Sequence, residues 1–134
     1  MTASAADLTA IAVAVQREWK DAFETRNLPR LSGLYADETA FYGSTATLYT
    51  DPAGVRTYFN VLPPSYVRAD YDTPHVVALG TDALAATGEV TFYTSGPDGL
   101  TALPYRMTHV LVRSAGRWKI ATHHASPMPV RSGH

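Results

Sequence analysis

Polar side chains near the carboxyl end of the chain could do acid–base or anion-binding chemistry. They are Arg106, His109, His123 and His124. Segments 100–113 and 117–125 alternate like paired strands around a turn at Ser114-Ala115-Gly116, which predicts a hairpin. An imidazole has an ordinary pKa of about 6.5, which suits a general acid or base at neutral pH. A hairpin that only supports the fold does not need this density of polar groups, so we place the candidate site here.

His123 and His124 are consecutive on the last predicted strand, so their side chains point to opposite faces of the sheet. Alternation groups His124 with Trp118 and Ile120, an apolar set that would ordinarily face the core. This favours His124 as the inward histidine. The alternative is His123, which shares its face with small residues such as Ala121 that suit a cavity wall; Trp118 and Ile120 would then face a second copy of the chain.

On the partner strand, alternation allows Arg106 or His109 to face inward, but not both. An inward Arg106 would bind an anion or a carbonyl oxygen, or would pair with Glu89 or Asp37, because a buried guanidinium without a partner is costly. An inward His109 would place a second imidazole close to the first. The sequence has no compact metal-ligand motif and no glycine-rich dinucleotide loop after a strand, so we expect neither a metal nor a cofactor.

Aromatic side chains, several with a hydroxyl group, are numerous enough to line a pocket for a small hydrophobic molecule. The candidates for this lining are Trp19, Tyr35, Tyr42, Tyr58, Phe92 and Tyr105.

Length, composition and net charge limit the kind of protein this can be and the kind of partner it can bind. The 134 residues fit one domain, with a core over about 5–128 and a loose tail after 129. With 46% hydrophobic residues, 17% charged residues and a formal charge of -1, we expect neither disorder nor nucleic-acid binding. There is no cysteine, which excludes a disulfide, a thiolate nucleophile and a cysteine-containing zinc site. The first residues form neither a signal peptide nor a membrane span, so we expect a cytoplasmic protein without membrane contact.

Three helices are predicted before residue 65. Ser4 and Asp7 form a capping-box pattern, after which apolar residues recur at helical spacing as far as Arg26-Asn27. Leu31, Leu34 and Tyr35 suit a short second helix. Asp51 followed by Pro52 predicts the start of a third helix, which ends at Leu62-Pro63-Pro64.

The remaining segments predict strands. A short strand over 39–43 and a less definite one over 48–50 precede the third helix, and five follow it, at 66–71, 75–80, 83–94, 100–113 and 117–125. Helices first and strands later indicate an α+β architecture, with the helices on one face of a curved, mostly antiparallel sheet. A cavity between sheet and helices would hold a ligand.

The order of elements and several motifs resemble the NTF2-like superfamily, the fold of ketosteroid isomerase, SnoaL-type polyketide cyclases and the association domain of calmodulin-dependent kinase. The matching segments are Trp19, 34–37 with 41–44, 54–59, 105–108 and, above all, 116–127. The resemblance is greatest to the small bacterial SgcJ/EcaC and DUF4440 (SnoaL-like) proteins. It implies a cone fold with three N-terminal helices packed on a curved sheet.

Two kinds of function are compatible with this resemblance. The first is cofactor-independent acid–base catalysis on a small hydrophobic or polyketide-like molecule, of the isomerase, dehydratase or cyclase type, with the inward histidine moving the proton. Arg106 or a tyrosine hydroxyl would stabilise an enolate oxygen. The alternative is a domain that binds a ligand or assembles without turnover, and we expect a homodimer in either case.

Overall fold

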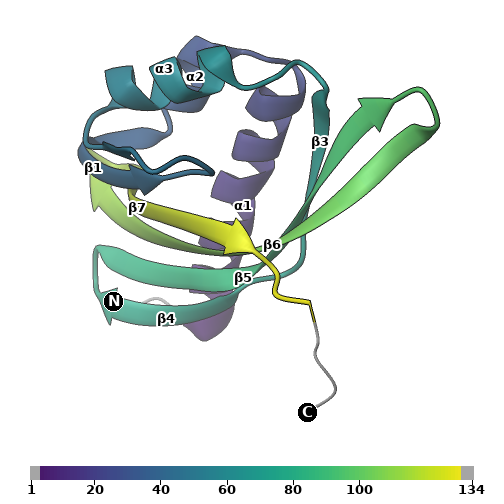
Figure 1. Cartoon of the computed structure of the whole chain (residues 1–134). Helices are drawn as coiled ribbons and strands as arrows, with labels where there is room; N and C mark the ends of the chain where they lie inside the picture. The colour runs from purple at the N-terminus through teal and green to yellow at the C-terminus, as the bar shows by residue number, and fades with distance from the viewer. Residues whose placement is uncertain (1–3, 131–134) are drawn as a thin grey trace.

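The computed structural model describes residues 4–130, in which helices cover one face of a curved seven-stranded sheet (Figure 1). The helices are α1 (Ala5–Glu24), α2 (Leu28–Ser32) and α3 (Pro52–Val61). The strands are β1 (Tyr35–Tyr42), β2 (Leu48–Tyr49), β3 (Tyr66–Tyr71), β4 (His75–Gly80), β5 (Ala83–Gly96), β6 (Gly99–Ser114) and β7 (Arg117–Pro127). This is the predicted α+β architecture.

The sheet is ordered β2-β1-β7-β6-β5-β3, and β4 pairs with β5. Only β1 and β7 run parallel; the other described pairs are antiparallel. The first half of β5 pairs with β4 and the second half with β3, so the sheet curves around α1. Beyond β3, the ends of β5 and β6 continue as an arm that projects from the rest of the molecule (Figure 1).

Helix α1 begins and ends through local side-chain chemistry. Ser4 Oγ accepts from the Asp7 backbone N–H at 3.1 Å, and Asp7 accepts from the Ser4 N–H at 3.2 Å, which confirms the predicted capping box. The left-handed residue after the helix is Arg26, with φ of 53°, rather than Asn27. Asn27 instead caps α2, where its side chain accepts from the Arg30 N–H. Tyr35, expected in the second helix, begins β1.

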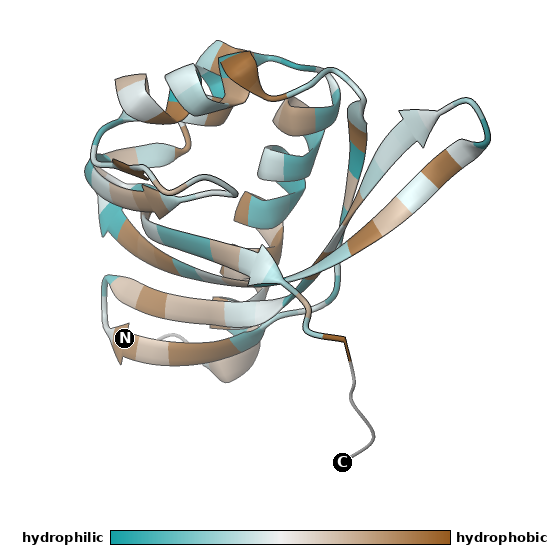
Figure 2. Ribbon diagram, in the orientation of Figure 1, coloured by the Kyte–Doolittle hydropathy of each residue, from teal (hydrophilic) through white to brown (hydrophobic). Residues whose placement is uncertain are grey.

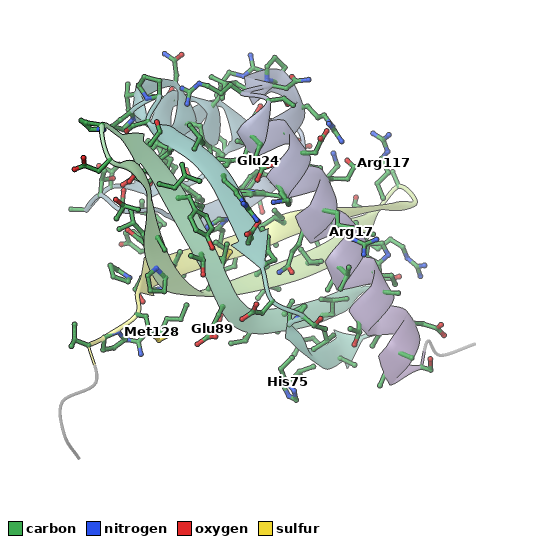
Figure 3. The ribbon with its side chains drawn as sticks, turned by 90° about the vertical axis from the view of Figure 1, so that its right-hand side faces the viewer. Arg17, Glu24, His75, Glu89, Arg117 and Met128 are labelled. Carbon is green, nitrogen blue, oxygen red and sulfur yellow. The ribbon has the colours of Figure 1, made fainter. Side chains whose placement is uncertain are left out.

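The edge strand β3 is fastened to α1 by charged side chains. Glu24, labelled in Figure 3, accepts a hydrogen bond from the Ala69 backbone N–H at 3.0 Å, and Lys20 donates to the Ala69 carbonyl at 2.7 Å. Lys20 also contacts Glu24 and Asp70 at 2.7 Å each. These contacts occupy backbone groups of β3 that would otherwise be exposed at the sheet edge.

The β6–β7 hairpin closes at the predicted turn. Ala115 and Gly116 have φ of 53° and 76°, as in the type I′ turns that match the twist of a hairpin. Farther along, β7 contains one extra residue: Leu111 pairs with Ile120, whereas Val110 pairs with Thr122, so Ala121 is a bulge. The bulge reverses the alternation of β7, and both Ile120 and His123 face the core.

Thr39 of β1 stabilises this bulge. Its buried hydroxyl lies 3.0 Å from the Ile120 carbonyl and 3.1 Å from the Ala121 carbonyl. Thr39→Val keeps the shape of the side chain but removes the donor, so we expect it to lower the free energy of unfolding by about 1–3 kcal/mol.

Urea denaturation would measure this loss, and Thr57→Val is a matched control. Thr57 makes a comparable bond to the Ala53 carbonyl on the exposed side of α3, and its replacement should change the free energy of unfolding by about 0.5 kcal/mol or less. Equal losses in the two variants would contradict a role for Thr39 at the bulge.

Candidate functional site

Two histidines from neighbouring strands meet beneath α1. His109 of β6 pairs with His123 of β7, and both side chains face the helices, with 0% and 3% of their surfaces exposed. Nε2 of His109 lies 3.1 Å from Nδ1 of His123. The choice left open between Arg106 and His109 is therefore settled in favour of His109.

His124 and Arg106 lie on the opposite face of the sheet. His124 is exposed, pairs with Thr108 across the strands and lies beside Tyr42, with ring centroids 5.6 Å apart. The expectation that His124 faces the core is wrong, because it assumed unbroken alternation along β7. Arg106 is also exposed and donates to the Ser126 hydroxyl at 3.2 Å, and it forms no ion pair with another described residue.

A buried chain of hydrogen bonds connects α1 and β1 to His123. The indole N–H of Trp19 donates to the Tyr35 hydroxyl at 3.0 Å, and this hydroxyl lies 2.8 Å from Nδ1 of His123. Tyr35 was expected only as part of a pocket lining. Its place at the start of β1, opposite Ile120 of β7, brings it to the histidine pair instead.

Burial keeps these groups neutral. It lowers the pKa of His109 from 6.5 to about 3. Burial also lowers the pKa of His123 well below 6.5, assisted by the neighbouring His109 and His124. The pKa of Tyr35 is raised by burial, although the hydrogen bond from Trp19 opposes the shift. At neutral pH the site therefore holds two uncharged imidazoles and a phenol.

His123 forms part of the wall of a small cavity between the sheet, α1 and α3. The other lining residues are Trp19, Phe23, Phe41, Gly43, Ser44, Tyr58, Phe59, Leu62, Tyr66, Phe92, Tyr105 and Ala125. None of them carries a charge. The free volume is about 40 Å³, close to the share of one water molecule in the liquid, so aromatic side chains fill most of the space.

Four of the residues predicted to bind a ligand lie in this wall, namely Trp19, Tyr58, Phe92 and Tyr105. Tyr35 lies behind His123, and Tyr42 is 40% exposed on the outer face of the sheet. Alternation along β1 could not choose the face that Tyr42 occupies, and its place beside His124 depends on the pairing of β1 with β7.

Tyr58 is held in place at the cavity by the loop after β1. The Ser44 backbone N–H donates to the Tyr58 hydroxyl at 2.9 Å, and the Ser44 hydroxyl lies 2.8 Å from it. A Cβ at position 43 would overlap the Tyr58 ring, so Gly43 permits this close approach.

Among residues 4–130, no three or more His, Cys, Asp or Glu side chains are grouped as metal ligands. Nor is any helix in this part of the chain both long and apolar enough to cross a membrane.

The sequence profile of the SnoaL-like domain matches residues 13–131. The chain belongs to the SnoaL-like domain family. No curated protein matches the sequence of this SnoaL-like domain. Its fold is similar to that of many solved structures, in accordance with the predicted NTF2-like cone.

Three of these structures illustrate the range of proteins that share this fold. A proposed calcium/calmodulin-dependent protein kinase II association domain from Xanthomonas campestris is 23% identical, with a TM-score of 0.79 over 88% of this chain and 86% of that one. A proposed NTF2-like dehydratase from Streptomyces avermitilis is 17% identical, with a TM-score of 0.77 and coverages of 92% and 98%. A Catenulispora acidiphila protein in complex with S-DNPA is 18% identical, with a TM-score of 0.81 and coverages of 91% and 94%. At these identities the likeness concerns the fold of the SnoaL-like domain.

Proposed function

We propose that this SnoaL-like domain, of the SgcJ/EcaC and DUF4440 type, catalyses an acid–base reaction without a cofactor on a small, uncharged, hydrophobic molecule. The reaction would be an isomerisation, a dehydration or a cyclisation, and His123 would move the proton. The observation that carries the proposal is the position of His123 on the cavity wall. Its Nδ1 is occupied by Tyr35 and His109, whereas no described residue bonds to Nε2, which leaves this nitrogen for a ligand.

The lining defines the molecule that would bind. Its lack of charged groups favours a neutral ligand, and its aromatic rings favour a flat one. Because the free volume is about 40 Å³, the ligand must displace some of the lining side chains; Leu62, which follows α3, and Tyr66, at the start of β3, are the least regularly held candidates by their place at element ends. The Catenulispora acidiphila relative in complex with a small molecule supports such binding.

Two test substrates with six-membered rings give the same product, so one measurement follows both reactions. Dehydration of 3-hydroxycyclohexanone and isomerisation of 3-cyclohexenone both yield 2-cyclohexenone, whose conjugated carbonyl absorbs in the ultraviolet. We expect the protein to accelerate at least one reaction, and His123→Gln to lower that rate about 100-fold or more.

His124→Gln is the matched control, because it changes the adjacent residue on the opposite face and should leave the rate almost unchanged. A folded His123→Gln variant with full turnover would refute the role of His123. Failure of the native protein to accelerate either reaction would count against catalysis on this class of ketone.

We also propose that two copies associate through the outer face of the sheet. A band across five strands is formed by Val77, Ala85, Val110, Thr122 and Ala40. It contains no charge, and Figure 2 shows hydrophobic colours along β4 and the adjacent part of β5. Such a face can pack against its own copy without repulsion between like charges. Ile120 cannot contribute, because it is buried in the core.

Val77 is 48% exposed, so Val77→Lys would introduce a charge into the band without disturbing the core. We expect a dimer by sedimentation or light scattering, and a shift to monomer in this variant. Thr57→Lys, on the exposed side of α3, is the control and should leave the dimer intact. A native protein that remains monomeric at high concentration would contradict this interface.

A further inference from the structure

The hydrogen bonds around His123 restrict where its proton can lie. Nδ1 of His123 has two neighbours within hydrogen-bond distance, the Tyr35 hydroxyl at 2.8 Å and Nε2 of His109 at 3.1 Å. The Tyr35 oxygen already accepts the Trp19 N–H at 3.0 Å. Since a phenol has one proton and a neutral imidazole has one N–H, the possible arrangements can be counted.

In the first arrangement, Nδ1 of His123 is the acceptor. The Tyr35 O–H and the His109 Nε2–H are both directed at its single lone pair, which they share, and the proton of His123 is on Nε2. The N–H or O–H groups of Trp19, Tyr35 and His109 then all have an acceptor. The remaining donor, the Nε2–H of His123, is left for the cavity. The buried atom left without a bond is Nδ1 of His109, which in this tautomer is only an acceptor.

In the second arrangement, Nδ1 of His123 carries the proton and donates to Tyr35 or to His109. The Tyr35 proton then has no acceptor among the described residues. If Nε2 of His109 accepts, the proton of that ring moves to Nδ1, which has no partner among residues 4–130. Buried donors without partners are costly, so this arrangement is disfavoured.

We propose that Tyr35 and His109 are positioning residues that hold His123 with its proton on Nε2, so that the cavity offers a proton donor to an uncharged hydroxy ketone. This inference rests on the proposed function and specifies its reaction. Burial keeps both imidazoles uncharged at neutral pH, in agreement with the count of hydrogen bonds.

A donor at Nε2 favours dehydration over isomerisation. In a β-hydroxy ketone, the Nε2 proton passes to the hydroxyl oxygen, the C–O bond breaks and water leaves with its electron pair. The electrons of the adjacent C–H bond form the C=C bond, and that proton returns to Nε2. His123 ends as it began and no second reactant is required. Isomerisation of a β,γ-unsaturated ketone must begin with removal of a proton from carbon, for which this tautomer has no free lone pair at Nε2.

The tautomer can be measured on the unliganded protein by long-range proton–nitrogen correlation of the histidine side chains, with signals assigned from the His→Gln variants. We expect Nε2 of His123 to carry the proton and Nδ1 to be unprotonated. A proton on Nδ1 overturns the inference. Tyr35→Phe should shift the nitrogen signals of His123, whereas Tyr42→Phe, on the outer face, should leave them unchanged.

Kinetics supply the second test. The native protein should turn over 3-hydroxycyclohexanone at least about tenfold faster than 3-cyclohexenone, and Tyr35→Phe should lower kcat for the hydroxy ketone about tenfold with little change in KM. The reverse preference between the substrates overturns the reaction assigned here. A proton on Nδ1 together with a rate that depends on His123 would refute this inference but not the proposed function. The expected tautomer together with a fully active His123→Gln variant would refute the proposed function alone.

Discussion

Acidification from neutral pH to about pH 4.5 is expected to lower the free energy of unfolding by about 3 kcal/mol through His109 alone and by up to about 5 kcal/mol with His123, because two buried histidines must remain neutral in the folded protein. Above pH 6.5 both the folded and the unfolded chain hold these imidazoles uncharged, so stability does not depend on them. Below pH 6.5 the unfolded chain binds protons that the folded chain excludes. The loss grows until the pH reaches the folded pKa, which is about 3 for His109 and well below 6.5 for His123.

The window between about pH 6.5 and pH 4.5 lies above the pH at which Asp70 loses its contribution to stability. Hydrogen bonds from Arg68 and Lys20 lower the pKa of Asp70, so its contribution is present above the ordinary value near 3.8 and is lost only below it. On the inner face of the sheet, the rings that contact the two imidazoles belong to Trp19, Tyr35, Phe41 and Tyr71, none of which gains charge in this range. His124, which also affects the pKa of His123, lies on the opposite face of the sheet.

Urea denaturation at a series of pH values would measure how the free energy of unfolding changes with pH. We expect a slope of about 1.4 kcal/mol per pH unit for each histidine. His109→Gln and His123→Gln should each remove about half of it, and His124→Gln should remove none. A native protein whose free energy of unfolding is constant across this window would show that the folded state takes up protons at the pair as readily as the unfolded chain does.

The sequence was sufficient for most of the architecture because local chemistry determined where the elements begin and end. The Ser4 capping box, the Asp51-Pro52 helix start and the turn at 114–116 each depend on residues close together in the chain. The long strands were also predicted closely, since turn residues separate them.

The inward histidine could not be predicted in the same way. Alternation along 117–125 selects His124 only if the strand is regular, and one extra residue at Ala121 moves every following side chain to the other face. The partner that accommodates this bulge, Thr39, lies on β1, more than 80 residues earlier in the sequence. A bulge held by so distant a contact leaves no clear pattern in its own strand.

The Trp19–Tyr35–His123 chain was missed for a related reason. Trp19 and Tyr35 were expected as hydrophobic lining, and their residue types do not distinguish a cavity wall from a buried hydrogen-bond partner. The distinction depends on the tertiary packing that brings α1 over the start of β1. The sequence does indicate the residue types that meet there, because His109 and His123 are both among its candidates for the site.

Replacement of Trp19 by alanine is expected to lower the free energy of unfolding by about 3–5 kcal/mol. The side chain is 1% exposed and stacks on Phe23 with a centroid distance of 5.0 Å. It also meets Phe59 and Phe92 edge to face, at 5.7 and 6.1 Å. Its removal would leave a large cavity at the point where α1, α3 and the sheet converge, and would take the indole N–H from Tyr35.

Trp118→Ala is the matched control, because the second tryptophan is only partly buried and stacks with the exposed Arg113 at 5.7 Å. We expect it to cost about 1 kcal/mol. Circular dichroism during urea denaturation gives both values, and Trp19→Phe separates ring packing from the hydrogen bond to Tyr35. If Trp19→Ala and Trp118→Ala lower the free energy of unfolding equally, Trp19 is not the centre of the core. If Trp19→Phe leaves the nitrogen signals of His123 unchanged, the indole N–H does not help to orient Tyr35, although the packing role would stand.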